Sequence, residues 1–157
     1  MGLNACVYCD CFQQGRLRVP APVRVTAASD GSVGPAVGSS VDEQKQFDDW
    51  RRSACEHPGG VYLSRRLGNV DLIGGIRATL ARTPDLYPVL LTRVVYSGSH
   101  SGDALSREFF DQLSTELDDL VRAQTRDARE SDWLLSFAAE IRRVLTAGRR
   151  MKQPIVF

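Results

Sequence analysis

The sequence predicts an α+β fold, built as a single domain with a small mixed sheet packed with three to four helices. Short apolar runs at residues 4–11 and 88–96 are typical of buried strands. Apolar stripes with a period of 3.6 residues alternate with these runs and indicate helices. No internal repeat and no long linker divides the chain, so we expect one domain over residues 1–157.

The composition is that of an ordinary globular protein, with 43% hydrophobic and 25% charged residues in 157. The net charge of +1 argues against a general nucleic-acid-binding protein, which usually has a strong basic excess. No apolar run reaches the roughly 18 residues that a membrane span needs. The first residues lack the features of a signal peptide. We therefore expect a cytoplasmic protein with reduced cysteines and no membrane partner.

The first 40 residues are expected to contain one buried strand and a long irregular segment. Alternating side chains at residues 4–11 indicate the strand. Residues 18–27 form an edge strand or a loop, because Pro20 and Pro22 cannot donate to a central ladder. Residues 28–40 are rich in Gly, Ser and Ala, and they predict a mobile loop.

Two helices have clear start signals. Ser40 followed by Glu43 matches a capping box and predicts a helix to about residue 54. Asn69 is a plausible N-cap for a second helix, in which Gly74 and Gly75 would allow close packing against a neighbour. The expected buried residues of these helices are Phe47, Trp50 and Ala54 in the first, and Ile73, Ile76 and Leu80 in the second.

The second half begins with the strongest strand signal. The run at residues 88–96 is almost continuously apolar, as expected for a central strand that is covered on both faces. Asp103 is then a candidate N-cap for the first of two long helices. Their apolar stripes are Leu105, Phe109, Leu113, Leu117 and Leu120, and then Leu134, Phe137, Ala138, Ile141 and Leu145. Residues 155–157 are expected to form a short strand or a docked tail.

Cysteine and histidine residues form the most informative constellation. Cys9 and Cys11 would lie on one face of a regular strand, because side chains repeat every two residues. Cys55 and His57 follow a helix end. Three thiolates and an imidazole suit tetrahedral zinc, although structural zinc sites usually have two to four residues between paired ligands. The sequence therefore offers zinc as a cofactor, with core packing of free cysteines as the structural alternative.

Catalysis by a cysteine is a second alternative. A reactive thiol needs a neighbouring histidine, a basic group or a helix N-terminus to lower its pKa. His57 and His100 are the two histidines of the chain, and they would have to activate Cys9, Cys11 or Cys55. No known nucleophile motif surrounds these cysteines, so a small thiol- or metal-dependent enzyme is the less favoured interpretation.

The turn at residues 96–103 is a candidate site at the end of the predicted central strand. His100 and Asp103 are candidate catalytic residues, whereas Tyr96 and His100 are candidate contacts for a partner. The segment lacks the lysine and the spacing of a phosphate-binding loop. A tight turn with Asp103 as a helix cap is the structural alternative.

Charged residues gather in the last two predicted helices. Glu116, Asp118 and Asp119 either neutralise the basic end of the final helix or offer an acidic face to a basic partner. The basic residues concerned are Arg142, Arg143, Arg149, Arg150 and Lys152.

Four segments carry a resemblance over the whole chain: residues 1–12 (MGLNACVYCDCF), 67–70 (LGNV), 96–103 (YSGSHSGD) and 154–157 (PIVF). They resemble a group of uncharacterised bacterial proteins associated with immunity proteins, the cytoplasmic antidotes of polymorphic toxins. That resemblance implies a non-catalytic protein that binds a cognate toxin, and it transfers no active-site residue. A toxin-immunity-like binding protein is therefore the favoured functional interpretation.

Overall fold

The computed structural model describes residues 2–97, 102–126 and 131–157. Its main sheet has four strands in the order β4-β1-β6-β5, and every neighbouring pair is antiparallel. The strands are β1 (Gly2–Tyr8), β4 (Val61–Asn69), β5 (Ala104–Leu105) and β6 (Ile155–Val156). The α+β class and the C-terminal strand are confirmed. The sheet is antiparallel in the described part of the chain and not mixed.

Strand β1 has the alternation that the sequence predicted. Leu3, Ala5 and Val7 are buried, while the intervening side chains are exposed or half-buried. The strand pairs with β4 from Gly2 to Tyr8, with register shifts near both ends. It ends at Tyr8, so the first cysteines of the predicted zinc site lie beyond the strand.

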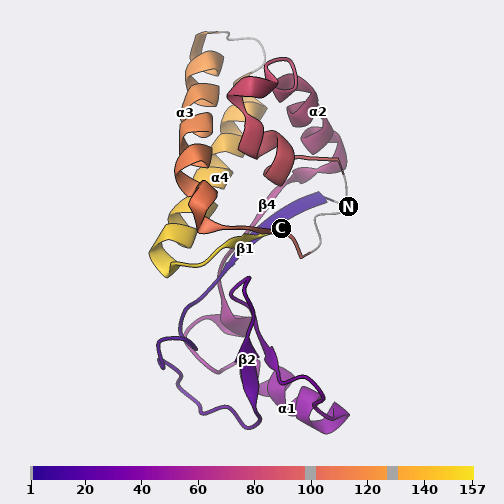
Figure 1. Cartoon of the computed structure of the whole chain (residues 1–157), viewed down its shortest axis with the longest axis vertical. Coiled ribbons are helices and arrows are strands. Elements are labelled where there is room, and N and C mark those ends of the chain that lie inside the picture. Colours follow the sequence, from indigo (N-terminus) through magenta and orange to yellow (C-terminus); the bar gives the residue numbers. More distant parts are fainter. Residues whose placement is uncertain (1, 98–101, 127–130) are drawn as a thin grey trace.

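Three helices lie in the upper part of Figure 1: α2 (Val70–Leu80) and α4 (Ser131–Met151) pack against β1 and β4, and α3 (Phe110–Arg126) packs against α4. Asn69 caps α2, because its side-chain oxygen accepts a hydrogen bond from the Leu72 N–H at 2.8 Å. The predicted stripes of α2 and α4 are buried, as are Leu113, Leu117 and Leu120 of α3. Leu105 and Phe109 precede α3, in β5 and in the short 3-10 helix η4 (Arg107–Phe109).

The predicted central strand at residues 88–96 is wrong, because this segment is helical. Another 3-10 turn, η2 (Pro84–Leu86), leads into it, and residues 90–94 form the π-helical turn η3 (Leu90–Val94). The buried side chains are Val89, Leu90, Val94 and Val95. The Val95 N–H donates to the Leu90 carbonyl at 2.8 Å, the bond between residues five apart that defines a π-helix. A short apolar run does not by itself distinguish a buried strand from a buried helix.

Glu116 of α3 fixes the start of this helical segment. Its carboxylate accepts hydrogen bonds from the backbone N–H groups of Val89 at 2.9 Å and Leu90 at 2.8 Å. These two groups have no partner inside a helix, so the carboxylate serves as their cap. Glu116 is only 3% exposed and is the one buried charged side chain in the described part of the chain. It therefore forms neither the acidic face nor the counter-charge that the sequence suggested, whereas Asp118 pairs with Arg142.

Residues 9–60 form a narrower lower part, which we call the small lobe (Figure 1). It contains α1 (Val41–Arg51) and a hairpin of β2 (Val25–Ala27) and β3 (Val33–Pro35). The Ser40–Glu43 capping box is confirmed. The prediction of a loop over residues 28–40 is wrong at β3, which the turn at Asp30 and Gly31 joins to β2. Phe47, Trp50 and Ala54 form a buried cluster of their own.

Candidate metal centre

Cys9, Cys11, Cys55 and His57 come together where the small lobe meets the strands β1 and β4. Their ligand atoms all lie within 4.8 Å of one another. The Sγ atoms of Cys9 and Cys55 are 3.7 Å apart. The Cys11 Sγ lies 3.4 Å from the Nδ1 of His57. The four residues that the sequence indicated as metal ligands therefore form one cluster, which could bind a metal ion.

The first pair of ligands is held by the end of β1 and the turn that follows it. The backbone N–H of Cys9 donates to the Gly60 carbonyl at 2.9 Å, which continues the strand pairing by one bond. The chain then reverses, and the Arg16 N–H donates to the Cys11 carbonyl at 2.8 Å. Gly15 has a φ of +66° in this turn, a conformation that favours glycine. Thus a turn, and not the alternation of a regular strand, places Cys11 beside Cys9.

The second pair lies between the end of α1 and the start of β4. The short 3-10 turn η1 (Pro58–Gly60) follows His57, and both of its glycines have positive φ, +63° and +72°. The Gly60 N–H donates to the His57 carbonyl at 2.9 Å. The Arg51 side chain donates to the Gly59 carbonyl at 2.8 Å, so α1 is tied to the same turn. This arrangement turns Cys55 and His57 toward the end of β1.

The spacing of the ligand atoms can be compared with a zinc tetrahedron. With Zn–S near 2.3 Å and Zn–N near 2.05 Å, two sulfurs lie about 3.8 Å apart, and a sulfur and a nitrogen about 3.6 Å apart. The corresponding distances here are 3.7 Å for Cys9–Cys55 and 3.4 Å for Cys11–His57. Two of the six distances among the ligand atoms therefore match a zinc tetrahedron, and the other four are at most 4.8 Å, although one residue separates the ligands of each pair in the sequence.

Burial makes thiolates costly in this cluster unless a cation is present. Cys9, Cys11 and Cys55 are 5%, 1% and 6% exposed. Loss of hydration raises the pKa of Cys9, and it raises the pKa of Cys11 to about 12, with further contributions from Cys9 and Cys55. Such thiols are poor nucleophiles at neutral pH, which argues against Cys9 and Cys11 as the nucleophile of a thiol enzyme. A bound divalent cation would reverse this preference.

Sequence reasoning missed the residues that surround His57. The Nε2 atom of this histidine lies 3.8 Å from a carboxylate oxygen of Glu56, while Nδ1 faces Cys11. Metal-bound histidines commonly orient their second ring nitrogen toward a carboxylate. The Tyr62 ring also meets the imidazole edge-on, with centroids 5.3 Å apart. Only the position of Glu56, directly before His57, could have signalled this role.

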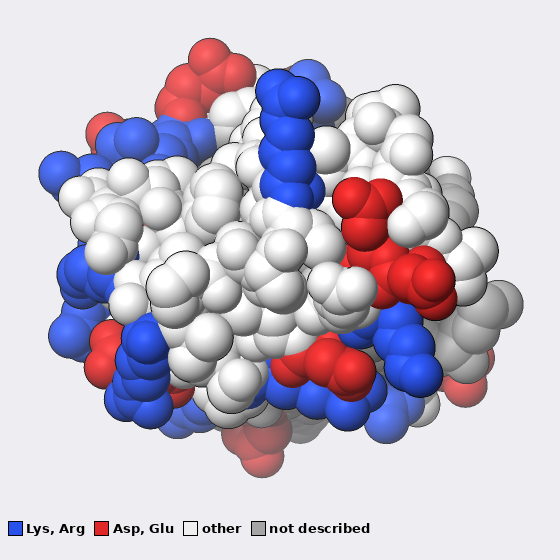
Figure 2. Space-filling view, turned by 90° about the horizontal axis from the view of Figure 1, so that it is seen from below, with Lys and Arg blue, Asp and Glu red and all other residues white. Residues whose placement is uncertain are grey.

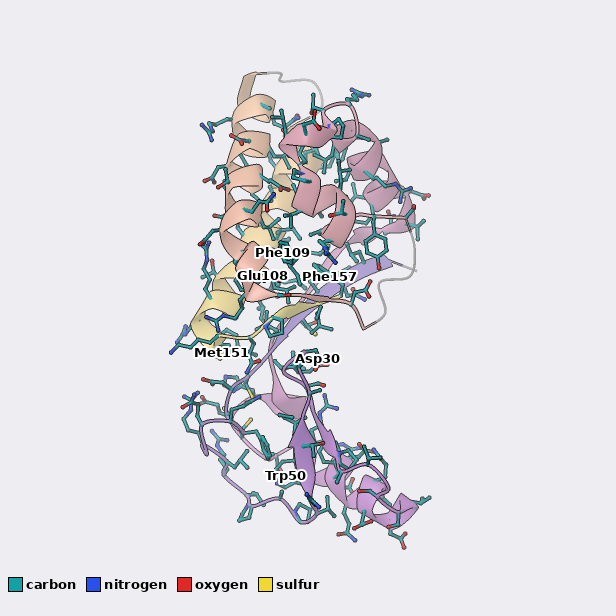
Figure 3. The ribbon with its side chains drawn as sticks, viewed as in Figure 1. Asp30, Trp50, Glu108, Phe109, Met151 and Phe157 are labelled. Carbon is teal, nitrogen blue, oxygen red and sulfur yellow. The ribbon has the colours of Figure 1, made fainter. Side chains whose placement is uncertain are left out.

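A small cavity of about 30 Å³ adjoins the sulfur atoms. Cys9, Cys11 and Cys55 line it, together with Trp50, Arg51 and Gly60 among others. In Figure 3, Trp50 lies within the small lobe, whereas Asp30 and Met151 lie near its junction with the rest of the molecule. The three cysteines of the cluster, but not His57, therefore border a cavity that has room for roughly one water molecule.

The second candidate site lies only partly in the described residues. His100 lies outside them. Asp103 is not a helix cap, because it precedes β5 and α3 starts later, after η4. Its carboxylate accepts a hydrogen bond from the Tyr96 hydroxyl, and its backbone carbonyl accepts one from the Phe157 N–H at 2.9 Å. These bonds tie the C-terminal strand to the preceding turn.

No helix among the described residues is long and apolar enough to cross a membrane. Comparisons of the chain with protein-family models, with curated proteins and with solved structures found no significant match.

Proposed function

We propose that this protein is a non-catalytic zinc-binding protein, in which the metal joins the small lobe to the strands β1 and β4. The observation that carries the proposal is the convergence of three buried thiols and one imidazole within 4.8 Å of one another, with two of the distances matching a zinc tetrahedron. Two ligands come from the end of β1, and two come from the turn before β4. A metal ion would therefore link the entry and the exit of the small lobe.

The ligand set favours zinc and a structural role. Thiolate and imidazole ligands suit zinc, whereas magnesium and calcium prefer oxygen. Catalytic zinc sites usually keep one position open for water or substrate, and structural sites have four protein ligands. Four side chains are available here, so the coordination sphere would be closed. This distinguishes the proposal from the alternative of a small metal-dependent enzyme.

The small lobe has a small apolar core, so a metal link would add to its stability. A unit of roughly 50 residues buries too little apolar surface to be very stable by itself. The buried members of this lobe's own cluster are Phe47, Trp50 and Ala54, and the residues packed against them are only partly buried: Phe12, Leu17, Ala21, Val23, Val25 and Val33. Structural zinc contributes on the order of 10 kcal/mol to the folding of comparable peptides. Metal binding would thus supply stability that the lobe's own core lacks.

A protein-binding role is the second part of the proposal, and the surface of the small lobe supports it. Val19, Val37 and Val41 are large apolar side chains that are 44%, 106% and 87% exposed. Figure 2 views the molecule from this end, and residues other than Asp, Glu, Lys and Arg fill much of the centre of that face, with most of the charged residues around them. Interfaces commonly have an uncharged centre and a polar rim. The resemblance to immunity proteins implies that the partner is a toxin.

Metal content and local stability test the zinc proposal. Protein purified under reducing conditions should hold one zinc ion per chain, and Cys9→Ser, Cys11→Ser and Cys55→Ser should each lose it. Cys6→Ser is the matched control, because Cys6 lies within β1, opposite Ser64 and Val156. Chelation should increase hydrogen exchange in residues 9–60 but not in α3 and α4. A wild-type protein that fails to bind added Zn²⁺ would contradict the proposal.

Binding to the product of an adjacent toxin gene tests the second part. Val37→Lys combined with Val41→Lys should weaken that complex by at least about tenfold, because charge is depleted from interface centres. Thermal stability should be nearly unchanged, since both residues are exposed. Leu86→Lys, at an exposed apolar residue outside the small lobe, is the control. Unchanged affinity in the double variant would exclude this surface.

A further inference from the structure

We propose that Cys9 and Cys55 are a reversible redox pair, whose disulfide displaces the metal and takes over its structural role. The proposal rests on the proposed zinc site, and it adds a modification that regulates that site. Its basis is the arrangement of the two sulfurs, the cavity beside them and the position of the two residues in the fold.

The two sulfurs are already in van der Waals contact. The separation of 3.7 Å must shorten to about 2.05 Å in a disulfide. Each residue lies in an irregular segment, Cys9 after the end of β1 and Cys55 between α1 and η1. Backbone shifts of a fraction of an ångström, together with side-chain rotation, can therefore close the gap without breaking a helix or a strand.

Cys11 is the less suitable member of the cluster. Its sulfur contacts the Nδ1 of His57 at 3.4 Å, whereas the sulfurs of Cys9 and Cys55 contact each other. A bond between Cys9 and Cys11 would close a small ring around Asp10 within a tight turn, where disulfide geometry is strained. The bond between Cys9 and Cys55 joins two segments that are 46 positions apart.

The cavity gives a small oxidant access to these sulfurs. Both Cys9 and Cys55 line it, and its volume of about 30 Å³ accommodates a molecule near the size of water. Hydrogen peroxide is the chemical class of oxidant that fits such a space. Larger disulfides such as oxidised glutathione are expected to react much more slowly, because the sulfurs are buried.

The reaction balances with peroxide as the two-electron oxidant. One thiolate attacks a peroxide oxygen, the O–O bond breaks, and a sulfenic acid forms with release of hydroxide, which becomes water. The second thiolate then attacks the sulfenic sulfur, the S–S bond forms, and the hydroxyl group leaves as a second water. In total, two thiolates, one peroxide and two protons give one disulfide and two waters. Zinc loses two of its four ligands and is released.

The position of the pair sets the structural consequence. Cys9 belongs to the entry of the small lobe, and Cys55 belongs to the segment just before its exit at Gly60. The disulfide would therefore connect the same two segments that the metal connects. Oxidation should release zinc while the small lobe stays folded, so the covalent link replaces the metal link.

The full-length zinc-loaded protein, titrated with hydrogen peroxide, tests this inference. One zinc ion should be released for each disulfide formed, and dithiothreitol with added Zn²⁺ should reverse both changes. Trypsin, which cleaves after Arg16, Arg52 and Arg65, should yield residues 1–16 linked to residues 53–65. Fragmentation of the linked peptide should place the bond at Cys9, and Cys6→Ser should behave like the wild type. A bond at Cys11, or sulfinic acids without a link, would overturn the inference.

A metal-free arm separates this inference from the zinc proposal. Reduced protein stripped of metal should form the same Cys9–Cys55 bond, but more slowly, because its buried thiols are mostly protonated at neutral pH. Cys11→Ser, which lacks a metal ligand, should form it too. If the wild type never binds Zn²⁺ but forms this bond, the zinc proposal fails and the redox pair stands. Hydrogen exchange gives the structural readout: oxidised protein should keep the protection of residues 9–60, which the chelated, reduced protein should lose by about tenfold. Equal loss in both forms would show that the disulfide does not replace the metal.

Discussion

The Sγ of Cys11 lies 3.4 Å from the Nδ1 of His57, although the two residues are 46 positions apart in the chain. This contact joins the turn after β1 to the segment before β4, and it forms one edge of the cluster. The imidazole is half-buried, and its other nitrogen faces Glu56. Because a neutral imidazole binds a metal through one nitrogen and donates through the other, Nδ1 is the nitrogen that would bind the metal in the proposed site.

Replacement of His57 tests whether this residue is a ligand of the proposed site. His57→Ala should weaken zinc binding by more than the 10- to 100-fold loss that is typical of changes around a metal site, because a ligand itself is lost. His57→Cys should restore binding with four sulfur ligands. Absorption spectra of the cobalt-substituted proteins should follow the change from three sulfurs to four. Glu56→Gln is the milder control, and identical cobalt spectra for the wild type and His57→Cys would contradict the assignment.

The stability of the metal-free protein should depend on pH through Cys11. The pKa of this thiol is about 12 in the fold, against an ordinary value of 9.0, because it is buried. Above pH 9 the unfolded chain loses a proton that the folded chain retains, so the fold loses stability, by up to about 1.4 kcal/mol per pH unit, until pH 12. Urea unfolding of metal-free wild type and Cys11→Ser should therefore diverge above pH 9. Parallel curves would contradict the prediction.

Glu116 should contribute to the free energy of unfolding, because its carboxylate caps the buried helical segment at residues 88–94. Glu116→Gln keeps the size of the side chain but places an amide NH₂ against one of the two N–H groups that the carboxylate now satisfies. A buried N–H without an acceptor costs about 1–3 kcal/mol, and we expect a loss in that range in urea unfolding. Asp118→Asn, at a half-exposed position on the same helix, should cost no more than about 1 kcal/mol. Equal effects would contradict the capping role.

Both Glu116 and the cysteines show what could be predicted from the sequence. Stripes such as Ile73–Ile76–Leu80 predicted their helices, because one buried face repeats with the helical period. Residues 88–96 lack such a face, and their helix depends on a carboxylate that lies 27 positions beyond Val89. No local pattern contains that information.

The cluster was predicted for a reason that is partly wrong. Residue chemistry identified Cys9, Cys11, Cys55 and His57, and the structure brings these four together. The regular strand that was expected to align the first two cysteines ends at Tyr8. Turns with positive φ at Gly15, Gly59 and Gly60 place the ligands instead. These turns bring the two pairs of ligands together only because β1 pairs with β4, which is a long-range contact that no local pattern predicts.

The last prediction concerns three glycines in helices, at which the same substitution, glycine to alanine, should change the stability in opposite directions. The sequence suggested that Gly74 and Gly75 allow close packing, but a Cβ atom at either position would meet no described atom within 4 Å. Alanine at each should therefore stabilise the protein by about 0.5–1 kcal/mol, because glycine is the poorer helix former.

Gly148 of α4 is different, since a Cβ atom there would lie 2.9 Å from two carbons of the Phe110 ring and 3.2 Å from the Gln153 carbonyl. Gly148→Ala should cost about 1–3 kcal/mol, because the buried ring of α3 must move. Thermal unfolding of the three single variants would measure these effects. Raised melting temperatures for the α2 variants beside a lowered one for Gly148→Ala would support the packing described here. A stabilised Gly148→Ala would mean that α3 and α4 are not in such close contact.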